Sequence, residues 1–155
     1  MGFHVKGIEE LMSALSEMAG PNFADGALRE GLRLGGKLVQ GTAKQLCPVG
    51  DPAYDPNSGQ LRNSIEMTDI SNGVDIGTNV GHAEPVEFGT GALGDPSVAH
   101  TTKEKWAYYG PNGFRTGKPH PPQPFLYPAL KANEANIEML VKNTLQAKIN
   151  KAVKG

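Results

Sequence analysis

The sequence predicts an α+β fold with two N-terminal helices, a small antiparallel sheet with a projecting loop or hairpin, and a long C-terminal helix packed on the sheet. Three observations predict it. Apolar residues recur at three- and four-residue steps near both ends of the chain, as in amphipathic helices. Apolar and polar residues alternate on both sides of Asn72-Gly73, which indicates a β-hairpin. Residues 91–122, rich in Gly, Pro and aromatic residues, then separate this hairpin from the last helix.

Composition bounds the domain organisation and excludes some functions. The 155 residues are enough for one core, so we expect a single domain over residues 1–155 with an inserted loop or hairpin at 91–122. A formal net charge of −1 gives no overall basic field for nucleic acid. No apolar stretch approaches the roughly 20 residues of a membrane helix, and the N-terminus does not resemble a signal peptide. We therefore expect a soluble protein without a membrane partner.

Two helices are expected before the sheet. The first covers residues 8–18, where one apolar stripe contains Ile8, Leu11, Met12, Leu15 and Met18, and Gly20-Pro21 ends it. The second covers residues 24–46, although four glycines lie inside it and each costs roughly 1 kcal/mol relative to Ala. Either another backbone packs closely on Gly31 and Gly35, or the helix breaks near Gly35-Gly36.

The middle of the chain predicts two hairpins. Leu61 to Asp69 forms the first strand and Val74 to Val80 the second, with Ser71-Asn72-Gly73 between them. Two strands alone are marginal, so a further strand or a helix has to cover their apolar face. Residues 81–90 are ambiguous, because Pro85 limits them to an edge strand or a helical turn. Residues 105–109 and 114–116 flank Gly110-Pro111-Asn112-Gly113 and predict the second hairpin.

The last helix is expected to begin near Pro128 and to run to about Val153. From Ile137 onward its apolar residues repeat every four positions, so the stripe drifts around the helix by about 40° per step. One flat partner surface does not cover such a stripe. The end of this helix therefore meets a different element or a neighbouring subunit.

Three segments carry a resemblance when they are read together. The first is Cys47-Pro48 followed by Ser58 to Ile65, the second is Ala83 to Thr90, and the third is Gln123 to Leu130. In this order, with a helix before and a helix after, they resemble the small tail-component or neck-protein family of long-tailed bacteriophages. The resemblance covers roughly residues 28–141, and the positions that carry it as a scaffold motif are Gly59, Leu61, Arg62, Ser64, Glu87, Phe88, Gly89, Thr90, Pro124, Phe125 and Pro128.

The chain departs from the family pattern in its loops. Residues 49–58 are an insertion, His82 stands where Tyr is common, and the aromatic hairpin after Thr90 is longer than in many relatives. From the residues alone, Phe125 and Leu126 are expected in the core, and Gly89 is expected to permit a turn that a side chain would block.

The resemblance implies a structural virion protein that acts in tail completion and head–tail joining by forming a ring at the neck, with six copies as in tail-tube-associated proteins. The implied partners are further copies of the chain and the head-closure or connector, tail-terminator or tail-tube proteins. The implied location is the virion neck or tail end, and the host cytoplasm during assembly. A tail terminator that caps the tube is the close alternative, and a host-directed binding module of a prophage is a further one.

A small cysteine-dependent hydrolase is the enzymatic alternative. Cys47 with a distant His would form its nucleophile pair, but Cys47 lies at the end of an apolar helix, where a buried thiol is common. The histidines (His4, His82, His100 and His120) show no metal-ligand spacing, and no phosphate-binding glycine motif is present. We therefore expect no enzyme, and no catalytic, cofactor or metal site.

Two groups of residues are candidates for contact instead. One is aromatic and cationic, and either forms a subunit or partner interface or folds back into the core: Trp106, Tyr108, Tyr109, Phe114 and Arg115. The other is Lys142, Lys148, Lys151 and Lys154. In a ring these lysines would contact DNA non-specifically in a central channel, and otherwise they are cations favoured near a helix C-terminus.

Overall fold

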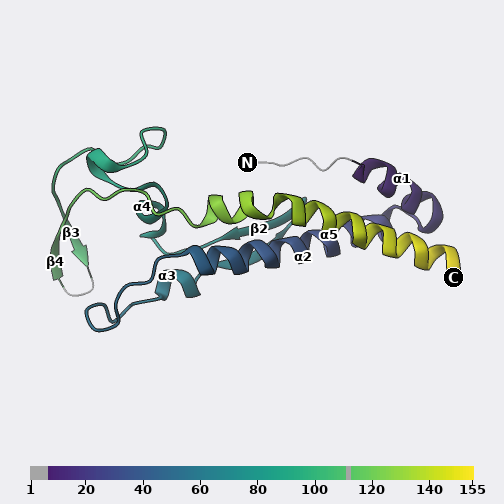
Figure 1. Ribbon diagram of the computed structural model, residues 1–155, viewed down its shortest axis with the longest axis horizontal. Helices are drawn as coiled ribbons and strands as arrows, with labels where there is room; N and C mark the ends of the chain where they lie inside the picture. The colour runs from purple at the N-terminus through teal and green to yellow at the C-terminus, as the bar shows by residue number, and fades with distance from the viewer. Residues whose placement is uncertain (1–6, 111–112) are drawn as a thin grey trace.

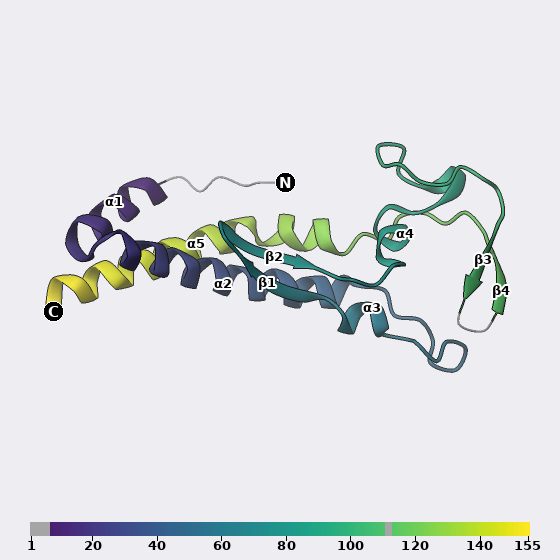
Figure 2. The same ribbon diagram turned by 180° about the vertical axis from the view of Figure 1, so that it is seen from behind.

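Two long helices, α2 (Pro21–Leu46) and α5 (Leu126–Lys154), lie side by side and antiparallel along the length of the molecule (Figure 1). The computed structural model describes residues 7–110 and 113–155. At one end the short helix α1 (Ile8–Ala19) lies against the pair, and at the other end the chain extends into a long excursion (Figures 1 and 2). The predicted α+β class is confirmed.

The glycines of α2 allow α5 to approach closely. A Cβ on Gly31 would lie 2.9 Å from Cα of Val141, and a Cβ on Gly35 would lie 2.9 Å from Cγ2 of Ile137. These distances are shorter than real Cβ contacts, so the backbone of α5 at Val141 and the side chain of Ile137 occupy the space that side chains of α2 would need. The helix continues through Gly35-Gly36 without a break. Close packing, rather than a break, is therefore how this helix tolerates its glycines.

Helix α1 covers the end of the helix pair that lies away from the long excursion. Gly20 has a φ of 91°, ends α1 and lets the chain reverse into α2, where Pro21 is the first residue. Helix α1 packs on both long helices, with Leu15 fully buried. This contact accounts for the drifting apolar stripe, because the C-terminal part of α5 meets α1 in addition to α2.

The first hairpin consists of β1 (Glu66–Ile70) and β2 (Gly73–Gly77), antiparallel with Ile70 opposite Gly73. It lies chiefly on α2, where a Cβ on Gly36 would be 2.7 Å from Sδ of Met67. The long C-terminal helix packs mainly along α2 and borders the hairpin across a groove. Helix α2 is therefore the shared partner of the sheet and of α5.

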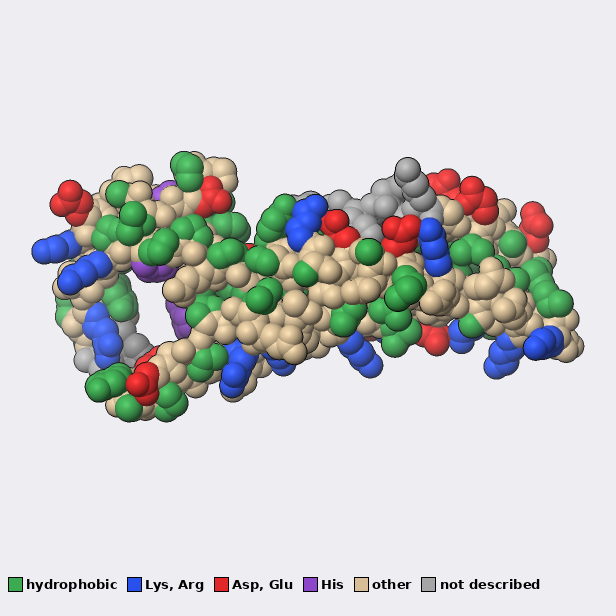
Figure 3. Space-filling model, viewed as in Figure 1, with side chains coloured by type: hydrophobic (Ala, Val, Ile, Leu, Met, Phe, Trp, Pro, Cys, Tyr) green, Lys and Arg blue, Asp and Glu red, His purple; other side chains and the backbone are tan. Residues whose placement is uncertain are grey.

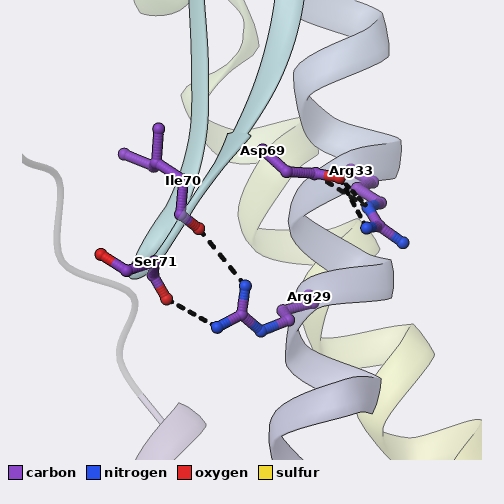
Figure 4. A network of polar contacts seen from close by, with 5 residues as sticks. All are labelled: Arg29, Arg33, Asp69, Ile70 and Ser71. Carbon is purple, nitrogen blue, oxygen red and sulfur yellow. Dashed lines mark hydrogen bonds and ion pairs between the residues drawn. The ribbon is translucent and has the colours of Figure 1, made fainter.

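Two arginines of α2 hold the hairpin in place (Figure 4). Arg33 donates hydrogen bonds to both carboxylate oxygens of Asp69, from Nε to Oδ1 at 2.9 Å and to Oδ2 at 3.1 Å, and from Nη2 to Oδ2 at 2.6 Å. Arg29 donates to the backbone carbonyl oxygens of Ile70 and Ser71 at the turn. The pKa of Asp69 lies below its ordinary value because its carboxylate accepts these hydrogen bonds from Arg33.

The predicted strand over Leu61 to Asp69 is wrong in its first half. Residues Gln60–Asn63 form the short helix α3, and the strand begins only at Glu66. Leu61 and Ile65 are both buried, and a spacing of four residues suits one helical turn as well as it suits alternation. Gly59, at a φ of 83°, starts the turn.

Other predicted boundaries move by a few residues. Strand β2 ends at Gly77 and not at Val80, because Thr78 bonds through its side chain to Ser64 and to the N–H of Val80. Helix α5 begins at Leu126, two residues before Pro128. Residues Ala83–Phe88 form the helix α4, which was one of the two options for that segment.

The second hairpin is confirmed as β3 (Trp106–Gly110) and β4 (Gly113–Gly117). Pro111 and Asn112 of its predicted turn lie outside the described residues, as does His4. The largest fully buried side chains of the core are Phe125, Leu15, Ile65, Leu145 and Val141. Among the described residues no helix combines the length and apolar character that a membrane span requires.

Candidate functional site

The most specific polar arrangement joins α4 to the start of α5. Glu87 is only 5% exposed, and its carboxylate accepts hydrogen bonds from three successive backbone N–H groups: Phe125 at 2.7 Å, Leu126 at 3.0 Å and Tyr127 at 3.0 Å. The first N–H groups of a helix have no partner within the helix, and the helix dipole favours an anion there. Glu87 therefore caps α5 from 38 residues away along the chain.

Gly89 and Thr90 bring the two ends of the excursion together. Gly89 has a φ of 73°, and a Cβ there would lie 2.7 Å from both the carbonyl oxygen of His120 and the nitrogen of Pro122. The backbone N–H of Thr90 donates to the carbonyl oxygen of His120 at 2.9 Å, and that of Gln123 donates to Val86 at 2.8 Å. Residues 91–122, called the arm below, thus leave the body and return to it at one clasped base.

The first part of the arm is ordered by local contacts. The two ring nitrogens of His100 lie 2.6 Å from the carbonyl oxygen of Val98 and 3.0 Å from that of Gly91. Asp95 accepts hydrogen bonds from the hydroxyl and the backbone N–H of Ser97, and these bonds lower the pKa of Asp95. This part of the arm connects the clasped base to the hairpin β3–β4.

The hairpin β3–β4 projects from the end of the molecule (Figures 1 and 2). Tyr109 and Phe114 are 81% and 74% exposed, and their rings meet edge to face at 5.8 Å between centroids. Trp106 lies over Gly117, where a Cβ would overlap its ring. Of the two options for the aromatic residues, the structure thus shows projection: Tyr109 and Phe114 do not join the core.

A cavity of about 900 Å³ lies between the hairpin and α4. It opens beside the arm, and histidine side chains line it (Figure 3). His82, His100 and His120 are among its lining residues, but the described residues contain no group of three side chains suited to holding a metal. The cavity is an open space framed by the arm.

Cys47 lies elsewhere, at the C-terminal end of α2, and is 4% exposed. Burial raises the pKa of its thiol. Its Sγ lies 3.7 Å from the carbonyl oxygen of Pro48, and within the described part of the chain no hydrogen bond joins it to a histidine. The geometry of a nucleophile with an adjacent base is therefore not formed at Cys47.

The remaining scaffold residues have structural positions. Leu61 is buried in the core, Arg62 is exposed, and the hydroxyl of Ser64 donates to the carbonyl oxygen of Leu61 at 2.7 Å. Phe88 is half-buried. Of the residues around the start of α5, Phe125 is fully buried as expected, Pro128 lies in the first turn, Pro124 is exposed, and Leu126 is only partly buried.

The four C-terminal lysines do not share one environment. Lys142 pairs with Glu138 at 2.6 Å, and Lys148 pairs with Glu30 of α2 at 2.8 Å. Lys151 and Lys154 lie in the last turn of α5, where the helix dipole favours cations. Two of the four charges therefore already face a carboxylate within the chain.

A second surface was not identified from the sequence. It is a groove of about 530 Å³ between β2 and the first half of α5, lined mainly by apolar residues such as Ile76 and Leu130 and also by Asp75. The alternation of Val74, Asp75 and Ile76 predicts a strand here. Alternation alone does not reveal which edge of that strand stays uncovered, so the groove could not be predicted. Comparisons of the chain with models of protein families, with curated protein sequences and with solved structures find no match.

Proposed function

We propose that this chain is a structural assembly protein of a long-tailed bacteriophage that acts in tail completion and head–tail joining as part of a ring at the neck. The observation that carries the proposal is the arm. It has a base held by Gly89 and Thr90 and a tip that presents Tyr109 and Phe114 to solvent. Exposed aromatic residues on a positioned projection are typical of contact with another protein.

Two of the three segments of the phage resemblance support the same proposal. They build the base of the arm: Glu87 caps the helix that begins after Pro124-Phe125, and Gly89 and Thr90 hold the returning chain. Two of the segments that resemble the neck-protein family are thus the ones that position the arm. This arrangement is suited to contact with another protein rather than to catalysis.

The shape suits a ring of head-to-tail subunits. The arm occupies one end of an elongated body, so it can reach the body of a neighbouring copy (Figure 1). An arm that contacts a different surface of the next copy makes a heterologous interface, and such interfaces close into rings. Sixfold symmetry follows from the resemblance, and Lys151 and Lys154 are the cations available to DNA passing through the ring.

Sedimentation velocity and native mass spectrometry of the purified protein test the proposal, alone and with purified tail tubes or head connectors. We expect a discrete ring species, or a monomer that becomes a ring on a tube or connector end, visible by electron microscopy. Mass spectrometry of purified virions should detect the chain. A protein that stays monomeric with every such partner and is absent from virions would contradict the proposal.

A further inference from the structure

Strand β2 has one edge that no other strand of residues 7–110 and 113–155 covers. In the first hairpin Ile70 pairs with Gly73 across a two-residue turn, so the backbone N–H and C=O of Gly73 and Asp75 point toward β1. The same groups of Val74 and Ile76 point the other way, to the side of the groove. No hydrogen bond among the described residues uses them. Uncovered strand edges are sites for the addition of another strand.

Strand β4 of the arm has a matching free edge. Gly110 pairs with Gly113, so the backbone groups of Gly113 and Arg115 point toward β3. Those of Phe114 and Thr116 point outward, and within the described part of the chain they too make no hydrogen bond. The arm therefore presents a strand edge, together with its aromatic rings, at the far end of the molecule.

The two free strands have the same length and the same boundaries. Gly73–Gly77 and Gly113–Gly117 each contain five residues and begin and end with glycine. Aligned end to end and antiparallel, they bring outward-pointing backbone groups face to face. The three interior pairs are then Val74 with Thr116, Asp75 with Arg115, and Ile76 with Phe114.

This alignment also places the apolar and aromatic side chains of the two strands on the face of the sheet that borders the groove. Directly opposite residues project to the same face of a sheet. Val74 projects toward α2, where it lies next to Gly36, so Phe114 would project to the same side, with the ring of Tyr109 edge to face beside it. On that side the groove of about 530 Å³ provides apolar walls, including Leu130 of α5.

The opposite face has complementary charge. Asp75 and Arg115 are both exposed, and the alignment places them directly opposite each other. Residues 66–77 contain three acidic and no basic residues, whereas the arm, residues 91–122, contains four Lys or Arg and two Asp or Glu. Asp69 already pairs with Arg33, and Asp75 is the acidic residue within β2 itself. Opposite charges at directly facing positions stabilise a strand pair.

We propose that β4 of one copy adds antiparallel to β2 of the next copy, with Arg115 opposite Asp75 and with Phe114 and Tyr109 in the groove. The result is a continuous four-stranded sheet across each subunit contact. Every copy donates an arm and accepts one, which is the heterologous contact that a ring needs. This inference rests on the proposed function, since it names the surface that receives the arm in the proposed ring.

Disulfide trapping between two copies tests the register. One copy carries Asp75→Cys and an affinity tag, and the other carries Arg115→Cys without a tag. Non-hydrogen-bonded antiparallel pairs have Cα atoms about 4.5 Å apart, inside the range of about 4.4–6.8 Å that disulfides need. We expect a tagged–untagged dimer as the main product of mild oxidation on a non-reducing gel. Cys47, being buried, remains reduced.

The matched control replaces Arg115→Cys by Thr116→Cys, whose side chain projects to the other face of the strand. It should give at least about tenfold less mixed dimer, because disulfides require facing Cβ atoms. If the copies form a ring but the 75–115 pair links no better than this control, strand addition is wrong while the proposed function stands. If wild-type copies form no ring, alone or with tail tubes, both proposals fail.

Charge reversal gives an independent measurement. Asp75→Arg and Arg115→Asp should each weaken ring formation at least about fivefold at low salt, because like charges directly opposite destabilise a strand pair. The double variant, Asp75→Arg with Arg115→Asp, should restore it. If the double variant is as weak as the worse single variant, residues 75 and 115 do not face each other.

Discussion

The carboxylate of Glu87 accepts a hydrogen bond from the backbone N–H of Phe125 at 2.7 Å, across 38 residues and the whole of the arm. The same carboxylate accepts from the next two N–H groups, so one buried side chain satisfies the first turn of the longest helix. The end of α4 and the start of α5 are therefore fixed to each other. Any motion of the arm takes place beyond this point.

Replacing this side chain tests its role as a cap. In Glu87→Gln the negative charge is lost, and an NH₂ group replaces one carboxylate oxygen. This group cannot accept a hydrogen bond from the backbone N–H groups that it faces. We expect a loss of about 2–4 kcal/mol in the free energy of unfolding, since hydrogen bonds to a charged group are strong and a buried unpaired N–H is costly. Denaturant unfolding followed by circular dichroism measures this loss.

Glu84→Gln is the control, because Glu84 lies on the same helix α4 and is exposed. It should change the free energy of unfolding by less than about 0.5 kcal/mol. Equal effects of the two variants would mean that Glu87 acts only through net charge.

The sequence allowed the two ends of this contact to be picked out, but not the contact itself. Pro124 and Pro128 mark a rigid start to a helix, and Glu87-Phe88-Gly89-Thr90 stands out as a motif. That Glu87 reaches the N–H groups of α5 depends on the path of the arm, the 32 residues 91–122. No local pattern encodes such a path, so a long-range cap is found only in the folded chain.

The glycines of α2 give a second prediction. Gly31→Ala should destabilise the protein by about 1–3 kcal/mol, because its Cβ would lie 2.9 Å from Cα of Val141, where a backbone has to move. Gly26→Ala is the matched control in the same helix, exposed and with nothing within 4 Å of an added Cβ. It should stabilise the protein by up to about 1 kcal/mol through helix propensity. Thermal unfolding of both variants measures the two changes in stability. Stabilisation by both substitutions would show that α5 does not touch α2 at Gly31.

The same positions show where sequence reasoning reached its limit. Gly31 and Gly35 suggested a close approach, because they lie four residues apart on one helix face, and both meet α5. The strand predicted to begin at Leu61 was wrong, because the spacing of four residues between the buried Leu61 and Ile65 fits both an alternating strand and one helical turn. The conformation of Gly59 decides between the two, and a backbone dihedral angle is not visible in a sequence.

Cys47 gives a chemical prediction. Because burial raises the pKa of its thiol, the folded protein should react with a thiol reagent much more slowly than the unfolded chain at pH 8. Because the pKa of Cys47 is raised by folding, the stability of the protein should also depend on pH. A raised folded pKa means that the unfolded chain ionises first, so stability should fall as the pH rises from about 8.5 toward the folded value. Absorbance-monitored labelling across a denaturant series measures the protection, and fast labelling of the native protein would overturn it.

The ion pair of Arg33 and Asp69 predicts a weak acid sensitivity. The pKa of Asp69 is lowered by hydrogen bonds from Arg33, so its contribution is present above about pH 4 and disappears as the pH falls through the folded value. Both side chains are about half exposed, so the contribution is small. Asp69→Asn should lower Tm by no more than about 2 °C at pH 7 and by less at pH 2–3. An undiminished difference at low pH would show that the amide disrupts packing.

The last prediction separates the stability of the body from the function of the arm. Removing residues 105–116 should leave a cooperative thermal transition near the wild-type Tm, because Tyr109 and Phe114 contribute little to the core. The deletion leaves Glu104 and Gly117 as the ends to be joined. Because Trp106, two residues after Glu104, pairs with Gly117, these ends lie close together and a short Gly-Gly link suffices to close the chain. The same deletion should abolish ring formation or docking on a tail tube, measured by sedimentation velocity. Loss of the cooperative transition would instead place the aromatic residues in the core, and unchanged assembly would mean that subunits meet through another surface.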